Sequence, residues 1–157
     1  MSKLIAQAEQ VARAAHEGQT DKAGVPYIGH PERVARTASQ TAPAHLAEQA
    51  TAVGWLHDAV EDTGVTIDQL RTQGFPEAVI AGVEAMTKRK GESIDDYFAR
   101  VRSDELARIV KAADIDDNTN PERVRKLDAR TQARLAAKYE QSRALLALDL
   151  QGVPVTG

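Results

Sequence analysis

The chain of 157 residues contains no cysteine. Disulfides, iron–sulfur clusters, thiolate catalysis and cysteine-based zinc sites are therefore excluded. A metal would have to be held by the four histidines and by carboxylates. No apolar run approaches the roughly 18 residues that a membrane span needs. The N-terminal residues turn polar at Gln7, so they do not predict a signal peptide. We therefore expect a cytoplasmic protein without a membrane partner.

Neither sign of charge is in large excess, since 20 Lys and Arg residues stand against 23 Asp and Glu residues. A dedicated nucleic-acid binder usually has a basic excess, so we expect no nucleic-acid partner. Hydrophobic residues make up 42% and charged residues 27%, as in an ordinary globular protein. The length fits one domain. We expect this domain to cover residues 1–150 and residues 151–157 to form a loose C-terminal tail.

Aromatic residues are scarce, at 4%, whereas alanine is abundant. Strands favour aromatic and β-branched residues, and alanine is the best helix former. With no convincing alternation of polar and apolar residues, the sequence predicts an all-α fold, a single-domain helical bundle. We expect Pro31 to open a helix and Thr66, Ser93 and Ser103 to cap others. The expected helices cover residues 3–17, 31–40, 44–62, 66–74, 76–87, 94–101, 104–118 and 129–149.

Four ionisable residues crowd the stretch His-Asp-Ala-Val-Glu-Asp at residues 57–62. On one helix, His57 would lie above Glu61, and Asp58 above Asp62. Carboxylates this close repel one another, and burying them without a partner is costly. A bound cation would relieve both problems. The alternative is that Glu61 and Asp62 are simply a solvated helix end.

Two further residues could join such a site. His30 lies where a glycine- and proline-containing loop meets a helix, and Asp114 lies among apolar residues of a predicted helix. A carboxylate there needs a partner, either a metal or a cation such as Lys88 or Arg108. The other two histidines fit simpler roles, because His16 lies near a helix end and His45 in a polar stretch. We expect a structural His16 and a surface His45.

The chain order of these residues, His30, then His57-Asp58, then Asp114, matches the H…HD…D pattern of the HD phosphohydrolase superfamily. Residues 8–120 resemble one branch of it, the hydrolase domain of the RelA/SpoT alarmone enzymes and the small single-domain alarmone hydrolases. The matching stretches are residues 15–19 (Ala-His-Glu-Gly-Gln), 26–31 (Pro-Tyr-Ile-Gly-His-Pro), 56–63 (Leu-His-Asp-Ala-Val-Glu-Asp-Thr), 86–88 (Met-Thr-Lys) and 111–114 (Lys-Ala-Ala-Asp) with Asn118.

The resemblance implies a helical bundle around one divalent cation, usually Mn²⁺. It also implies removal of the 3′-pyrophosphate from a guanosine polyphosphate. Two imidazoles and two carboxylates suit a transition ion better than Mg²⁺. Glu61 and Asp62 match the acidic pair associated with hydrolysis and could orient or deprotonate a water molecule. By the same match, the metal ligands are His30, His57, Asp58 and Asp114.

The expected partner is a nucleotide or another phosphate-containing small molecule. By resemblance, its binding residues are Lys22, Tyr27, Lys88 and Asn118. The length leaves no room for the synthetase domain of the long enzymes, so we expect degradation alone. Sequence does not determine the oligomeric state, and the apolar positions of the helix over residues 129–149 could form a homodimer interface.

Two departures from the family pattern keep other functions open. The family usually has Arg then Lys in its first loop, and this chain has Asp21 and Lys22. Its fourth motif usually reads Asp-Arg-x-x-Asn, and here Ile115 replaces the arginine and is followed by two more aspartates. Because an aspartate would repel phosphate, a different nucleotide or phosphate ester fits almost as well. A non-catalytic HD domain that senses a nucleotide is a further alternative.

Overall fold

The protein is all-helical, as predicted. The computed structural model describes residues 2–155. Within them, β-structure is limited to two isolated β-bridges, one between Thr20 and Pro26 and one between Leu148 and Pro154. The last two residues of the predicted tail lie outside this range. In chain order the elements are α1 (Lys3–Ala15), α2 (Gly29–Thr41), the 3-10 turn η1 (Ala44–Leu46), α3 (Ala47–Leu56), α4 (Ala59–Asp62), α5 (Ile67–Thr72), α6 (Glu77–Met86), α7 (Ile94–Ser103), α8 (Glu105–Asn118), α9 (Pro121–Val124) and α10 (Ala129–Leu146).

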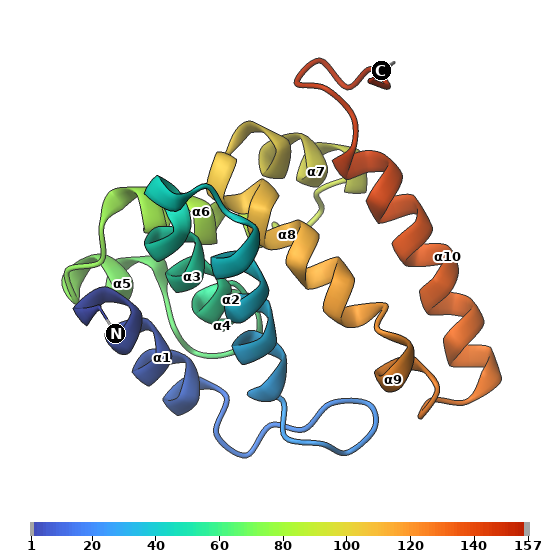
Figure 1. Ribbon diagram of the computed structural model, residues 1–157, viewed down its shortest axis with the longest axis horizontal. Helices are drawn as coiled ribbons and strands as arrows, with labels where there is room; N and C mark the ends of the chain where they lie inside the picture. Colours follow the sequence, from blue (N-terminus) through green and yellow to red (C-terminus); the bar gives the residue numbers. More distant parts are fainter. Residues whose placement is uncertain (1, 156–157) are drawn as a thin grey trace.

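Helices α2, α3 and α8 form the centre of the bundle, and α8 lies between the α2–α3 pair and α10 (Figure 1). Their facing sides are fully buried, with Val34 on α2, Val53 on α3 and Val110 on α8 at 0% exposure. Trp55 is buried in the same core. Burial of aliphatic side chains from three helices therefore holds together the elements that also contain the candidate site.

A glycine allows α2 and α3 to approach closely. A Cβ atom built on Gly54 would lie 2.6 Å from the Cα of Ala35 and 2.9 Å from its backbone nitrogen. These contacts are with backbone, so a side chain at residue 54 could be accommodated only by moving one helix. Because His30 is on α2 and His57 follows α3, the same close approach brings the two histidines together.

Replacing Gly54 with alanine is expected to lower the free energy of unfolding by about 1–3 kcal/mol, the usual cost of overpacking. Chemical unfolding followed by circular dichroism measures this. Gly64→Ala is the matched control, because within residues 2–155 no heavy atom lies within 4 Å of the Cβ that it adds. The control should change stability by less than about 0.5 kcal/mol. Equal effects at the two positions would contradict the packing argument.

Several predicted helix boundaries differ from the structure by one to three residues, three of them for identifiable reasons. Helix α2 begins at Gly29 rather than Pro31, which is tolerated because the first N–H groups of a helix have no acceptor within it. Asp104, not Ser103, caps α8 by accepting the N–H of Ala107 at 2.9 Å. Helix α10 ends at Leu146 instead of residue 149 because Asp149 caps a turn, with Oδ1 accepting the N–H of Val153 at 2.9 Å. The predicted caps at Thr66 and Ser93 are confirmed.

The single helix predicted over residues 44–62 is also wrong, because it is divided into η1, α3 and α4. The break between α3 and α4 falls at His57 and Asp58. The His57 Nδ1 lies 2.7 Å from the Gly54 carbonyl oxygen. In a continuous α-helix that oxygen would accept the N–H of Asp58. The imidazole therefore takes an acceptor from the backbone and ends α3 at the candidate site.

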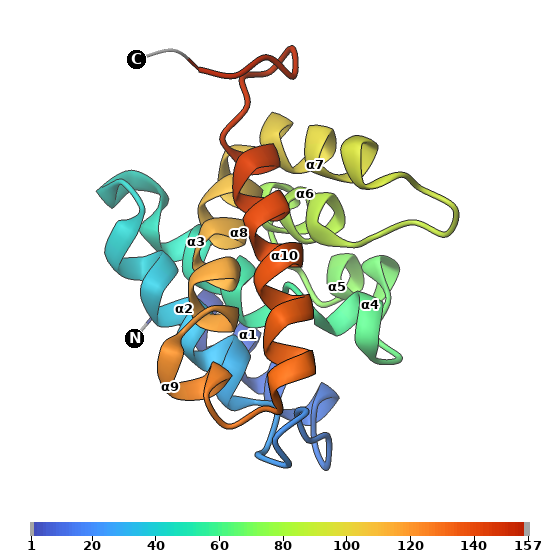
Figure 2. The same cartoon turned by 90° about the vertical axis from the view of Figure 1, so that its right-hand side faces the viewer.

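Helix α10 crosses one side of the bundle, where it packs on α7 and α8 (Figure 2). The buried Arg102 of α7 donates to the Leu145 carbonyl oxygen at 2.9 Å and so holds the C-terminal end of α10. Among the described residues, none of the helices combines the length and the apolar character that crossing a membrane would require.

Candidate functional site

The structure brings the four predicted metal ligands together. His30 comes from the start of α2, His57 and Asp58 from the break between α3 and α4, and Asp114 from α8. Ligand atoms of His30, His57 and Asp114 all lie within 4.8 Å of one another. The Asp114 Oδ1 is 2.9 Å from the His30 Nε2 and 3.4 Å from the His57 Nε2. The Asp58 Oδ2 lies 3.1 Å from the His57 Nε2 and 3.6 Å from the His30 Nε2.

Both imidazoles turn Nε2 toward the same point because Nδ1 is engaged on the far side of each ring. The His57 Nδ1 lies 2.7 Å from the Gly54 carbonyl oxygen, which can only accept, so Nδ1 donates. The His30 Nδ1 lies 2.6 Å from the Asp117 carboxylate. The His57 Nε2 is buried and has no hydrogen-bond partner among residues 2–155. A neutral imidazole with its proton on Nδ1 offers the Nε2 lone pair, so this orphaned atom fits a metal ligand.

The aspartates of this cluster are held as anions. Burial disfavours the charge of Asp114, but the Lys111 ammonium, 3.0 Å from Oδ2, and the two imidazoles outweigh it and keep its pKa well below the usual range. Burial likewise opposes the charge of Asp58, but without a metal the carboxylates of Asp58 and Asp114 raise the pKa of His57, and the resulting imidazolium lowers the pKa of Asp58 to about 2. The cationic partner of Asp114 is therefore Lys111 rather than Lys88 or Arg108, the two cations named as alternatives to a metal.

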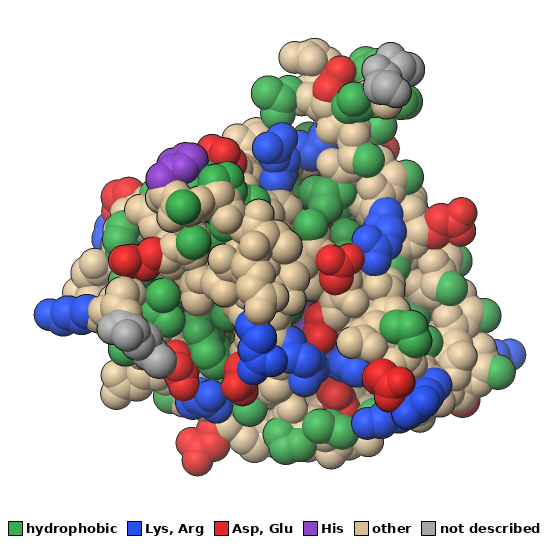
Figure 3. All heavy atoms as spheres, viewed as in Figure 1, with side chains coloured by type: hydrophobic (Ala, Val, Ile, Leu, Met, Phe, Trp, Pro, Cys, Tyr) green, Lys and Arg blue, Asp and Glu red, His purple; other side chains and the backbone are tan. Residues whose placement is uncertain are grey.

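One cavity opens at this cluster, and a second adjoins the first. The smaller, of about 150 Å³, contains the four predicted ligands, and the larger has a volume of about 330 Å³. Tyr27, Asn118 and Tyr139 line both, so they form the common wall. Basic side chains gather on the face where α2 and α9 approach each other (Figure 3). The basic residues lining the larger cavity are Lys22, Arg33, Arg123 and Lys126, and those lining the smaller one are Lys88, Lys111 and Lys138.

The two residues of the predicted acidic pair differ in position. Glu61 lines the smaller cavity, and its Oε1 accepts the backbone N–H of Lys88 at 2.8 Å. Asp62 lies at the exposed end of α4. Among residues 2–155, it is not one of those that line the two cavities. Partial desolvation and the nearby carboxylates of Asp58 and Glu61 raise the pKa of Asp62. Glu61 is thus the carboxylate of the pair that faces the cluster directly.

The loop at residues 88–91, whose Lys88 N–H binds the Glu61 carboxylate, is itself fixed by Arg100 of α7. The Arg100 guanidinium donates to the carbonyl oxygen of Thr87 at 2.9 Å and pairs with Glu92 at 2.7 Å. Both partners flank the basic loop at residues 88–91. This loop therefore presents the N–H of Lys88 to Glu61 from a fixed position.

The four predicted substrate-binding residues all line the cavities. Lys22 lines the larger cavity, Lys88 the smaller, and Tyr27 and Asn118 line both. The Tyr27 hydroxyl also donates to the Asp58 Oδ2. The Asn118 side-chain amide donates to the Asp114 Oδ1 at 3.1 Å. Tyr27 and Asn118 therefore orient candidate metal ligands as well as face the cavities.

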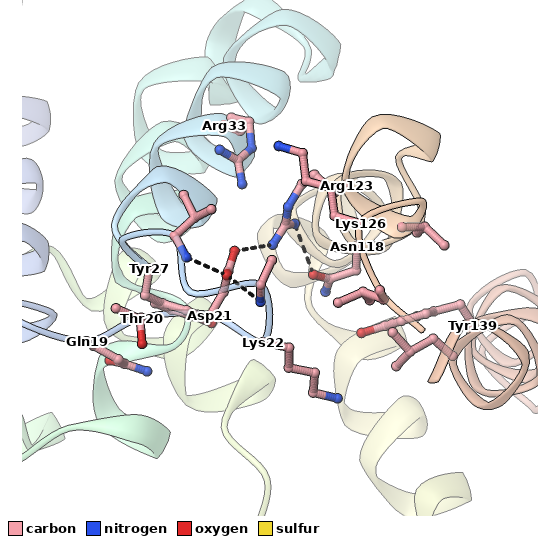
Figure 4. Close-up of a pocket in the computed structure, with 15 residues that line it drawn as sticks. Gln19, Thr20, Asp21, Lys22, Tyr27, Arg33, Asn118, Arg123, Lys126 and Tyr139 are labelled. Carbon is pink, nitrogen blue, oxygen red and sulfur yellow. Dashed lines mark hydrogen bonds and ion pairs between the residues drawn. The ribbon is translucent and has the colours of Figure 1, made fainter. Parts of the chain in front are cut away.

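Asp21 lies in the wall of the larger cavity, but its carboxylate is already engaged. Its Oδ1 accepts the backbone N–H groups of Ala23 and Val25 at 2.9 and 3.0 Å, and its Oδ2 is 3.6 Å from the Arg123 guanidinium (Figure 4). The charge of Arg123 only partly offsets the predicted repulsion of phosphate, because the same guanidinium pairs more closely with Asp117, at 2.6 Å. The other two histidines match their predictions, since His45 is exposed and the buried His16 bonds Gln19 at 2.8 Å.

Several residues at the site were not predicted. Lys111 could have been found from its spacing, because residues three apart share a helix face and it precedes Asp114 by three. In the sequence, Asp117 is distinguished only as one of several aspartates that follow one another. Helix α10 contributes residues with no motif around them. The unpredicted lining residues from α10 are Leu135, Lys138, Tyr139 and Ser142.

No family model matches the chain, whereas several curated proteins are similar to it. A guanosine-3′,5′-bis(diphosphate) 3′-pyrophosphohydrolase of Haemophilus influenzae is 41% identical over 78 residues, which cover 50% of this chain and 11% of that protein. The bifunctional (p)ppGpp synthase/hydrolase SpoT of Escherichia coli is 40% identical over 86 residues, covering 55% of this chain and 12% of SpoT. A GTP pyrophosphokinase of Streptomyces coelicolor is 32% identical over 123 residues, which cover 71% of this chain and 14% of that protein. The chain thus spans only a small part of these relatives.

A solved structure resembles almost the whole chain. It is described as a metazoan ortholog of SpoT that hydrolyses ppGpp, and it superposes with a TM-score of 0.74 at 19% identity, covering 93% of this chain and 86% of that one. The fold is therefore the all-α fold of HD-type proteins. The matched part of the chain is similar to (p)ppGpp 3′-pyrophosphohydrolases of the SpoT type, which confirms the resemblance predicted from the motifs.

Proposed function

We propose that the chain is a metal-dependent phosphohydrolase of the cytoplasm that removes the 3′-pyrophosphate of guanosine polyphosphates. The observation that supports this most directly is the convergence of His30, His57, Asp58 and Asp114 beside a cavity that Glu61 and three lysines line. The names of the similar proteins supply the substrate class.

In this proposal one divalent transition ion, Mn²⁺ in the first instance, is held by His30, His57, Asp58 and Asp114. Nitrogen and oxygen donors together suit such an ion. When bound, it would act as a Lewis acid that lowers the pKa of water and offsets charge at phosphorus. Lys111 keeps Asp114 ionised, and the Tyr27 hydroxyl fixes the orientation of Asp58, so these two residues prepare the ligands.

Glu61 has the role of orienting a water molecule and accepting its proton. Its Oε1 is held by the N–H of Lys88, which leaves the other carboxylate oxygen for a second partner. Asp62, one residue further, assists from the edge through its charge. Partial desolvation and two carboxylates raise the pKa of Asp62, so it is a stronger base than an ordinary aspartate, but it lies outside the smaller cavity that Glu61 lines.

The two joined cavities suit a substrate with phosphate groups at one end and a nucleoside at the other. Lys88, Lys111 and Lys138 surround the smaller cavity, where the transferred phosphates would lie beside the cluster. Lys22 faces the larger cavity, and apolar side chains of Val124, Leu127 and Leu135 also line it. Tyr27 and Asn118, at the common wall, would contact the substrate between its two ends.

The proposal is tested by incubating the purified chain with Mn²⁺ and ppGpp and separating the products by ion-exchange chromatography. We expect GDP and pyrophosphate, and no product in the presence of EDTA. The position of Asp21 in the wall of the larger cavity favours a second candidate, the same reaction on another nucleotide. A panel of nucleotide phosphates decides between them. Mn²⁺ binding without turnover of any substrate would contradict both and favour a nucleotide sensor.

A further inference from the structure

Asp117 lies directly behind the candidate metal ligand His30. Its Oδ2 is 2.6 Å from the His30 Nδ1, on the side of the ring opposite the cluster. The aspartate is only 8% exposed, and it belongs to α8, one turn after Asp114. One helix thus contacts both ring nitrogens of His30, since the Asp114 Oδ1 is 2.9 Å from Nε2.

Two arginines fill the remaining positions around the Asp117 carboxylate. Arg33 of α2 donates through Nε to Oδ1 at 2.7 Å and through Nη2 to Oδ2 at 3.2 Å. Arg123 of α9 donates through Nη1 to Oδ2 at 2.6 Å. Two guanidinium groups on a single buried carboxyl favour its anionic form. Asp117 is thus held from three elements, α2, α8 and α9.

An anion that accepts from one ring nitrogen of a histidine has two effects on the other nitrogen. It keeps the proton on Nδ1, so that the Nε2 lone pair is free to ligate, and it makes the imidazole a stronger base. It also fixes the plane of the ring. His57 has the weaker form of this arrangement, because its Nδ1 donates to a neutral carbonyl oxygen.

We propose that Asp117 is a positioning residue that holds His30 in its metal-ligating form and links the metal centre to the larger cavity. The link is made by Arg33 and Arg123, which both line that cavity. The inference rests on the metal site of the proposed function, but it does not depend on the identity of the substrate.

The test is the affinity of the purified chain for Mn²⁺ alone, measured as loss of the free-ion electron paramagnetic resonance signal. Asp117→Ala is expected to weaken binding by about 10–100-fold, the usual cost of removing such a partner. Asp117→Asn keeps the shape and an acceptor oxygen but not the charge, so its loss should be smaller. Asp116→Asn is the matched control, because Asp116 is the neighbouring aspartate and pairs instead with Arg143 at the surface. The control should bind Mn²⁺ like the unaltered chain.

A purely structural role for Asp117 predicts a different result. Its removal would then lower the melting temperature in EDTA but leave the Mn²⁺ affinity of the folded protein unchanged, and this outcome would overturn the inference. If Asp117→Ala does not fold, Asp117→Asn decides by the same measurement, and affinity equal to that of the control overturns the inference. Failure of the unaltered chain to bind Mn²⁺ would remove the metal site and the inference together. Binding without ppGpp hydrolysis would contradict only the proposed substrate.

Discussion

Asp114→Asn is expected to weaken Mn²⁺ binding and to lower ppGpp turnover, each by more than about 100-fold. Residues that only contact a metal ligand contribute about 10–100-fold, and a ligand itself should contribute more. The asparagine matches the shape of the aspartate but removes the charge at the point where both Nε2 atoms meet. Asp116→Asn, two residues further on α8, should leave both quantities unchanged. Turnover and Mn²⁺ affinity are measured on the same preparations.

The variant also removes the partner of Lys111, and breaking a buried ion pair costs about 3–5 kcal/mol of stability. Loss of activity could then reflect unfolding. The double variant Asp114→Asn with Lys111→Met separates the two causes, because it leaves no buried ammonium without a carboxylate. We expect it to melt nearer the unaltered chain and still to bind Mn²⁺ weakly. Restored Mn²⁺ affinity in the double variant would contradict the role of Asp114.

The sequence could predict that these four residues converge because their order along the chain is informative, even though His30 and Asp114 are 84 positions apart. Their convergence depends on a packing feature that no ligand motif contains. Gly54 lets the backbone of α2 approach that of α3, and this sets the separation of His30 and His57. A glycine inside a predicted helix did not by itself indicate which element lies against it.

The remaining features needed tertiary structure for identifiable reasons. Helical periodicity predicted one helix over residues 44–62, but the His57 imidazole competes with the backbone for the Gly54 carbonyl oxygen. Asp117 acquires its role from His30 and two arginines on other elements, so its neighbours in sequence could not indicate it. Lys138 and Tyr139 line the cavities only because α10 packs on α7 and α8.

Glu61→Gln is expected to lower kcat for ppGpp hydrolysis by about 10²–10⁴-fold, the usual contribution of a general base. The glutamine keeps an oxygen that can accept the N–H of Lys88, so the loop at residues 88–91 should stay in place. What is lost is the negative charge and the ability to take a proton. Since Glu61 is outside the predicted ligand set, KM and the affinity for Mn²⁺ should change little.

Asp62→Asn is the informative comparison, because the two carboxylates are adjacent in sequence but only Glu61 lines the smaller cavity. If position decides, the loss of kcat at Asp62 should be at least tenfold smaller than at Glu61. If Asp62 accepts the proton instead, the order reverses, and its raised pKa, caused by partial desolvation and the carboxylates of Asp58 and Glu61, would favour this role. A larger loss at Asp62 would therefore transfer the role of proton acceptor to that residue and leave Glu61 to hold the loop that contains Lys88.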